Sequence, residues 1–166
     1  HAFPYYCVVG HWPVTLYRTG APCCAPLIHR GRKIASIDGG CSLKWDGQLN
    51  VLELPRTPGG DFHWYAYDGL PTAVALDGQV PSADSVNVRW GRNVLEVLER
   101  GELLSRCRHL ETGRELEVLN EYLYVQDGVT RCEDSTDYRL EIVPGDTVSV
   151  VRRLPDRALV KKNGVT

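Results

Sequence analysis

The chain has 166 residues, a length that suits one domain or two small ones. Apolar residues make up 43% of it and charged residues 24%, which excludes disordered, collagen-like and membrane-embedded proteins. The formal net charge is −2, so the basic excess that a nucleic-acid partner requires is missing and we expect no such partner. The uncharged stretch 2–17 is too short to cross a bilayer, and no membrane span is expected.

Alternation of apolar and polar residues predicts short, half-buried strands along the chain. It is clearest at residues 41–45, 86–90, 138–142 and 147–150, and a Pro144-Gly145 turn would join the last two into a hairpin. Six turn pairs punctuate the pattern: Asp38-Gly39, Asp46-Gly47, Asp68-Gly69, Asp77-Gly78, Asp127-Gly128 and Asn163-Gly164. The sequence therefore predicts a single all-β domain over residues 1–166, an antiparallel sandwich or barrel.

Residues 93–124 also place apolar side chains at helical spacing. Asn93 could cap a helix and Gly101 could end it, but fewer than three turns would fit between them. Gly113 separates this segment from the next candidate, so we favour strands.

The cysteines and the lack of methionine indicate a compartment. Six cysteines and no methionine are typical of a processed, secreted chain that begins at an arbitrary residue such as His1, and we expect an extracellular protein with oxidised cysteines. The connectivity stays open. A zinc site is disfavoured because His11, Cys23, Cys24 and His29 lack paired ligand spacing, so no metal is expected. The predicted disulfide cysteines are Cys7, Cys23, Cys24, Cys41, Cys107 and Cys132.

A weak internal twofold repeat relates residues 1–58 to residues 59–126, followed by a β-hairpin segment at 127–166. The segments Gly31-Arg32-Lys33 and Trp45-Asp46-Gly47 align with Gly101-Glu102-Leu103 and Gly113-Arg114-Glu115. Two such β modules could bury their apolar faces against each other.

The second half resembles the DM9 repeat of natterin-like proteins. The resemblance rests on Leu70-Pro71-Thr72-Ala73-Val74, Val88-Arg89-Trp90-Gly91-Arg92, Gly113-Arg114-Glu115 and Glu121-Tyr122-Leu123-Tyr124-Val125. It implies a β-structured module and, as in some members, mannose binding in invertebrate immunity. The family's Gly-Lys step reads Gly101-Glu102 here, so a lysine-dependent sugar site could survive only at Lys33.

Residues 141–166 resemble an SH3-type hairpin. The turn at Pro144-Gly145-Asp146 leads into a strand at 147–151, and a second strand follows at 157–162. The aromatic residues that bind peptides in such domains are missing, so no function follows from this likeness.

Four tryptophans and eight tyrosines, against two phenylalanines, supply polar-tipped aromatic surfaces. A sugar ring can stack on such a side chain while polar groups take its hydroxyls. The clusters that fit are Trp45-Asp46 with Lys33, and His63-Trp64-Tyr65 with Tyr67-Asp68. The opposing interpretation places Trp45 and Trp90 in the core, because their neighbours alternate as buried strands do. The candidate ligand-binding residues are Lys33, Trp45, Asp46, Trp64, Asp77 and Arg92.

No catalytic motif is present, and we expect neither catalytic residues nor a cofactor. The favoured function is recognition without catalysis by a lectin-like, carbohydrate-binding protein. The partner is a glycan or, as an alternative for an effector or toxin-like protein, a cell-surface protein of a host. A copper monooxygenase with His1 as a metal ligand is the second alternative. The oligomeric state stays open.

Overall fold

The structure is a computed structural model that describes residues 3–57 and 59–166, and it confirms an all-β protein. Within these residues the only helices are three short 3₁₀ segments, Val14–Tyr17 (η1), Arg30–Arg32 (η2) and Asn120–Tyr122 (η3). None of them is long and apolar enough to span a membrane.

The chain forms two compact units. Unit 1 comprises the residues up to Arg18, Cys23–Pro81 and Leu140–Thr166, and unit 2 comprises Thr19–Pro22 and Ser82–Arg139. These units are defined by compactness, whereas the predicted repeat halves are defined by similarity between two segments of the sequence. The units therefore do not test the repeat, which stays a prediction.

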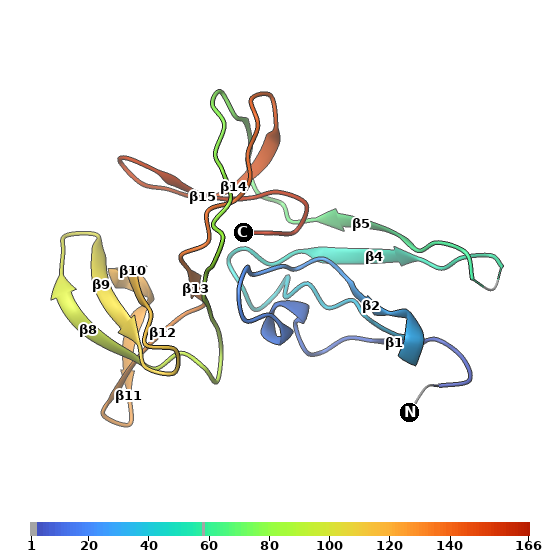
Figure 1. Ribbon diagram of the computed structural model, residues 1–166, viewed down its shortest axis with the longest axis horizontal. Helices are drawn as coiled ribbons and strands as arrows, with labels where there is room; N and C mark the ends of the chain where they lie inside the picture. Colours follow the sequence, from blue (N-terminus) through green and yellow to red (C-terminus); the bar gives the residue numbers. More distant parts are fainter. Residues whose placement is uncertain (1–2, 58) are drawn as a thin grey trace. The chain divides into compact units, whose positions relative to one another are not determined.

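Unit 1 contains three small sheets (Figure 1). The first has the strand order β1-β3-β2, the second is the ribbon β4-β5, and the third has the order β15-β14-β6. All pairs are antiparallel except β1 and β3, which run parallel. The strands are β1 (Cys7–Val9), β2 (Leu27–His29), β3 (Ile34–Ser36), β4 (Leu49–Glu53), β5 (His63–Tyr67), β6 (Thr72–Val74), β14 (Thr147–Arg153) and β15 (Ala158–Lys161).

The interior of unit 1 is partly polar. The Asn50 side chain, 7% exposed, donates to the carbonyl oxygens of Cys24 at 2.7 Å and Ile37 at 3.0 Å, and accepts from the Gln48 amide at 2.7 Å. Lys161, 3% exposed, donates to the carbonyl oxygens of Asp46 and Gly47. Because buried polar groups are costly unless they are paired, these bonds fix where β4 and β15 lie.

Unit 2 has an apolar core and three further sheets, with strand orders β10-β9-β8, β11-β12 and β13-β7. The preference for strands over a helix in residues 93–124 is confirmed. The strands are β7 (Asn87–Val88), β8 (Leu95–Arg100), β9 (Leu104–His109), β10 (Glu115–Leu119), β11 (Leu123–Gln126), β12 (Val129–Cys132) and β13 (Ser135–Thr136). The buried core consists of Val86, Val88, Leu95, Cys107, Leu116, Val118 and Cys132.

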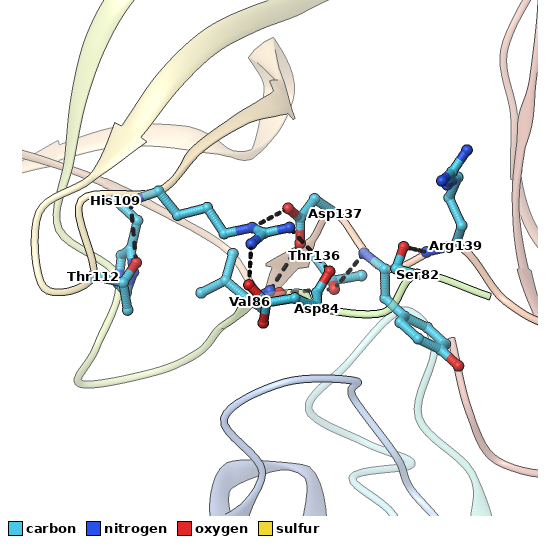
Figure 2. A network of polar contacts seen from close by, with 10 residues as sticks. Ser82, Asp84, Val86, His109, Thr112, Thr136, Asp137 and Arg139 are labelled. Carbon is cyan, nitrogen blue, oxygen red and sulfur yellow. Dashed lines mark hydrogen bonds and ion pairs between the residues drawn. The ribbon is translucent and has the colours of Figure 1, made fainter.

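A network of hydrogen bonds and ion pairs joins the two ends of the segment Ser82–Arg139 of unit 2 (Figure 2). The Arg114 guanidinium pairs with the carboxylates of Asp137 and Asp84, and Asp137 also accepts from the Val86 amide at 2.8 Å. At the boundary, the Ser82 amide donates to the Arg139 carbonyl at 3.0 Å, and the Arg139 amide donates to the Ser82 hydroxyl at 2.9 Å. The two ends of the segment 82–139 are therefore held together.

Several local predictions are confirmed. Asp127-Gly128 and Asn163-Gly164 have positive φ at both residues, as two-residue hairpin turns require. The strands predicted at 147–151 and 157–162 pair as the hairpin β14–β15, and β7 forms within the predicted strand 86–90. The likeness of this hairpin to SH3 domains stays a prediction.

Other predictions of strands are wrong. Residues 41–45 form turns, and the 138–142 segment does not pair with β14, whose neighbours are β6 and β15. In the described residues no sheet closes into a barrel, and sandwich packing stays a prediction.

The predicted disulfide framework is not supported, because all six cysteines are free thiols in the structure. Cys24, Cys107 and Cys132 are at most 1% exposed and pack as small apolar side chains. Cys41 is exposed, and the remaining two, Cys7 and Cys23, are half-buried.

Candidate binding surface

In the predicted cluster of Lys33, Trp45 and Asp46, the two charged side chains are engaged with other parts of the protein. Lys33 ends η2 in the left-handed region at φ 57°, and its ammonium group donates to the Pro4 carbonyl at 2.9 Å. The Asp46 carboxylate accepts from the Thr166 hydroxyl at 2.7 Å and lies 3.4 Å from the Lys44 ammonium. Trp45 is solvent-exposed in the same loop. The neighbours Trp45 and Asp46 therefore differ, since the ring is available to a ligand and the carboxylate is held internally.

The other predicted residues are spread over the chain. Trp64 is half-buried on β5, and Asp77 is exposed in the connection that follows β6. Arg92 belongs to unit 2, where its exposed guanidinium pairs with Glu111.

Arg92 lines a depression of about 220 Å³ with Asn93, His109 and Glu111 among its walls. The buried His109 ring makes hydrogen bonds through both nitrogens, Nε2 to the Arg92 carbonyl oxygen at 3.0 Å and Nδ1 to the Thr112 hydroxyl at 2.9 Å. The polar side chains that line the depression are therefore mostly hydrogen-bonded within the protein. This makes the depression a weaker candidate for a ligand site than an exposed surface with free side chains.

The core interpretation of Trp45 and Trp90 is wrong. Trp45 is 78% exposed and Trp90 is 65% exposed. Both lie in turns, Trp45 in the loop before β4 and Trp90 in the tight turn between Arg89 and Arg92. Alternation along the sequence does not imply burial where the backbone is not extended.

The ribbon β4–β5 carries exposed apolar side chains at facing positions of its two strands. In this antiparallel pair Leu49 lies opposite Tyr67, and Val51 lies opposite Tyr65. Residues directly opposite each other point to the same face of a sheet, so these four side chains share one face. All are exposed by 54% or more. We call this set of Leu49, Val51, Tyr65 and Tyr67 the tyrosine strip.

The register of the ribbon follows from what lies on its other face. Asn50 of β4 is buried there with its hydrogen-bond partners, and Trp64 of β5 is half-buried. Just before β5, the Phe62 ring contacts Tyr6 edge to face at 4.8 Å between centroids, and the Arg30 guanidinium lies 5.4 Å from its centre. A shift of one residue would bury the tyrosine strip and expose Asn50, so these contacts fix which face meets solvent.

Contacts at both ends of the strip position the tyrosine rings. The Tyr65 hydroxyl donates to the Glu53 carboxylate at 3.3 Å, and Glu53 lies opposite His63 in the next pair of the ladder. The Tyr67 ring lies against Gly69, where a Cβ would meet its hydroxyl at 3.7 Å and two ring carbons within 3.9 Å. Tyr65 thus leans toward the Glu53 end and Tyr67 toward the opposite end, where β5 ends.

The electrostatics of the strip are simple. The Glu53 carboxylate contacts the strip through the Tyr65 hydroxyl. Arg30 is engaged with Asp61 at 3.0 Å, the Gly60 carbonyl and the Phe62 ring, which all precede β5. In the described residues no three His, Cys, Asp or Glu side chains form a group that could hold a metal ion. The surface therefore offers flat rings, aliphatic contacts and hydroxyl and carboxylate oxygens.

The sequence contains a signal for this surface. The aromatic cluster His63-Trp64-Tyr65 with Tyr67 predicts a binding segment, with Trp64 as its candidate residue in place of the two tyrosines. Because side chains alternate along a strand, Tyr65 and Tyr67 had to share a face and Trp64 had to lie on the other. Assigning Leu49 and Val51 to the same surface requires the register of β4 against β5, and the local sequence pattern does not contain that register.

Comparison of the chain with protein-family models, with curated proteins and with solved structures finds no match in any of the three.

Proposed function

We propose that the protein is a non-catalytic carbohydrate-binding protein and that the tyrosine strip is its combining surface. The observation that carries this proposal is that Tyr65 and Tyr67 lie on one exposed face, beside Leu49 and Val51, with their rings positioned from both ends.

The physical reason is the match between such a face and a sugar ring. The CH groups of a pyranose form an apolar patch that stacks on an aromatic ring, and its hydroxyls need hydrogen-bond partners at the edge of the contact. The tyrosine hydroxyls and the Glu53 carboxylate supply partners at the ends of the strip.

An extracellular, lectin-like role related to the DM9 repeat, in which some cysteines become oxidised, belongs to the same proposal and rests on the sequence alone. An intact mass measured after alkylation in denaturant, without reduction, tests the oxidation state. Six alkylated thiols would remove the support that the cysteines give to an extracellular location. The alternative copper site depends on His1, which lies outside the described residues.

A glycan array probed with the full chain tests the proposed function. We expect binding that Tyr65→Ala and Tyr67→Ala each weaken by at least about tenfold, or about 1.4 kcal/mol. Tyr17→Ala is the matched control, because Tyr17 is 53% exposed on η1 and outside the strip. No binding to any glycan, together with a purified cell-surface protein bound through the strip, would favour the effector alternative instead.

A further inference from the structure

The strip is longer than one sugar ring. Tyr65 and Tyr67 are two residues apart on one strand, about 6.7 Å along its axis. Their rings lean in opposite directions, Tyr65 toward Glu53 and Tyr67 over Gly69, so the aromatic surface extends beyond both Cα positions. A single monosaccharide could contact one of these rings and would leave the other without a partner.

The shape of the ribbon favours an extended ligand. Leu49 and Val51 lie across the ladder from the two tyrosines and on the same face, so the four side chains form a band along the two-stranded ribbon. Its members are exposed by 54% to 74%, which describes an open face and not an enclosed pocket. An open band contacts a chain along its length, whereas selection of a chain end requires walls that surround the terminal sugar.

The charges on the strip disfavour an acidic ligand. Glu53, exposed at one end, would repel the carboxylates or sulfates of an anionic polymer. The nearby Arg30 is engaged with Asp61 and with the Phe62 ring. A neutral chain of hydroxyl groups meets no such repulsion, and its hydroxyls can donate to the Glu53 carboxylate.

Resting on the proposed function, we propose that the tyrosine strip binds internal stretches of an unbranched, uncharged polysaccharide whose sugars carry equatorial hydroxyls. In such β-linked chains the hydroxyls project sideways and the CH groups face up and down. Successive rings can then stack on Tyr65 and Tyr67 while the chain runs along β4 and β5.

Titration calorimetry with the full chain tests this proposal. The probes are neutral β-1,4-linked glucose oligomers of one to six units and a linear polymer of the same linkage oxidised to carry carboxylates. We expect affinity to rise at least about tenfold from one unit to four, an increment of about 1.4 kcal/mol. The oxidised polymer should bind more weakly than the neutral oligomers.

The variants separate the two rings. Tyr65→Ala and Tyr67→Ala should each remove most of the gain with length, and the double variant should bind oligomers no better than glucose. Tyr65→Phe keeps the ring and loses the bond to Glu53, so it should retain the length dependence. Tyr17→Ala is the control, and unchanged circular dichroism shows that each variant is folded.

The outcomes are distinct. Glycan binding on the array without length dependence, or preference for the oxidised polymer, would overturn this inference and leave the proposed function in place. Binding of the oligomers that is unaffected by the double variant would overturn the assignment to the strip. A complete lack of glycan binding, or binding of an extended peptide in place of any glycan, would overturn both.

Discussion

The ammonium group of Lys161 lies 2.9 Å from the carboxylate of Asp68, and both groups are largely withdrawn from solvent, with 3% and 17% of their side chains exposed. Lys161 is on β15 and Asp68 follows β5, so the ion pair joins the end of the ribbon to the C-terminal hairpin of unit 1. The same ammonium group donates to the carbonyl oxygens of Asp46 and Gly47. One cation thus holds three segments that are far apart in the sequence.

Lys161→Met should destabilise the protein strongly. The variant leaves the Asp68 carboxylate and two carbonyl oxygens without their donor, and breaking a buried pair in this way costs about 2 to 3 kcal/mol of unfolding free energy. Urea unfolding followed by circular dichroism measures the change. Arg157→Met, which disrupts an exposed pair with Asp156, is the control and should leave the midpoint unchanged. Equal midpoints for the two variants would contradict this role of Lys161.

The stability of unit 1 should fall in acid because of Asp68. Burial by itself raises the pKa of this carboxyl, but hydrogen bonds from Lys161, the Leu70 amide and Ser149 outweigh burial and hold the pKa below its ordinary value. Since the unfolded chain then binds a proton more readily than the folded one, stability is full above the unfolded pKa and is lost as the pH falls through the folded pKa.

Urea unfolding of the native protein and of Asp68→Asn between pH 7 and pH 2 measures this contribution. We expect the stability difference between the two proteins to be largest at neutral pH and to shrink in acid. A difference that grows as the pH falls would contradict the lowered pKa of Asp68.

Removal of the Asp137 side chain should loosen unit 2. Asp137→Ala removes both an ion-pair partner of Arg114 and the acceptor of the Val86 amide, so the unfolding free energy of unit 2 should fall by about 1 to 2 kcal/mol. Asp84→Asn removes the other ion pair, whose carboxylate is 84% exposed, and should have little effect. Hydrogen exchange of the Val88 and Cys107 amides reports on this unit, and equal protection in the two variants would contradict the assigned role.

The buried thiols should resist alkylation. Burial is the main cause that raises the pKa of Cys24 and of Cys132 to about 12, and it also raises the pKa of Cys107. Because the thiolate is the reactive form, these three should stay unmodified by iodoacetamide at pH 8 in the folded protein, while the exposed Cys41 reacts. Peptide mass mapping before and after unfolding in urea distinguishes them. Rapid labelling of Cys107 without denaturant would show that the core of unit 2 opens readily.

Strand formation was predictable where side chains alternate and the partner strand lies close in sequence. The hairpin β14–β15 and the turn at Asp127-Gly128 are examples, because the residues that define them are local. The choice of strands over a helix in residues 93–124 also follows from local signals, since Gly101 and Gly113 leave segments too short for a stable helix.

Predictions failed where long-range contacts override the local pattern. Trp45 follows an alternating run, but a Cβ at Gly47 would lie 2.2 Å from the Gly40 carbonyl oxygen, so only glycine permits this close approach. The backbone between these glycines folds into turns instead of a strand. In the same way, β6 pairs with β14 although residues 75–146 lie between them in the sequence, and no local signal identifies that partner.

The candidate surface was predictable in part. The aromatic content of residues 63–67 indicated a binding segment, and alternation assigns Tyr65 and Tyr67 to one face. Which face meets solvent depends on Asn50, whose buried hydrogen bonds reach residues far away in the sequence. That information exists only in the folded structure.

The hydrogen bonds between Ser82 and Arg139 have a consequence for the order of folding. β6 and β14 can pair only after the intervening chain has closed a long loop, which is entropically unfavourable and slow. If unit 2 forms first, its paired ends bring Pro81 and Leu140 together, and the loop that remains to be closed shrinks to residues 75–81 and 140–146. The segment 82–139 would then speed the pairing of β6 with β14 by holding their connections together. We therefore expect its replacement by a flexible linker of equal length to slow refolding, even where the final fold is retained.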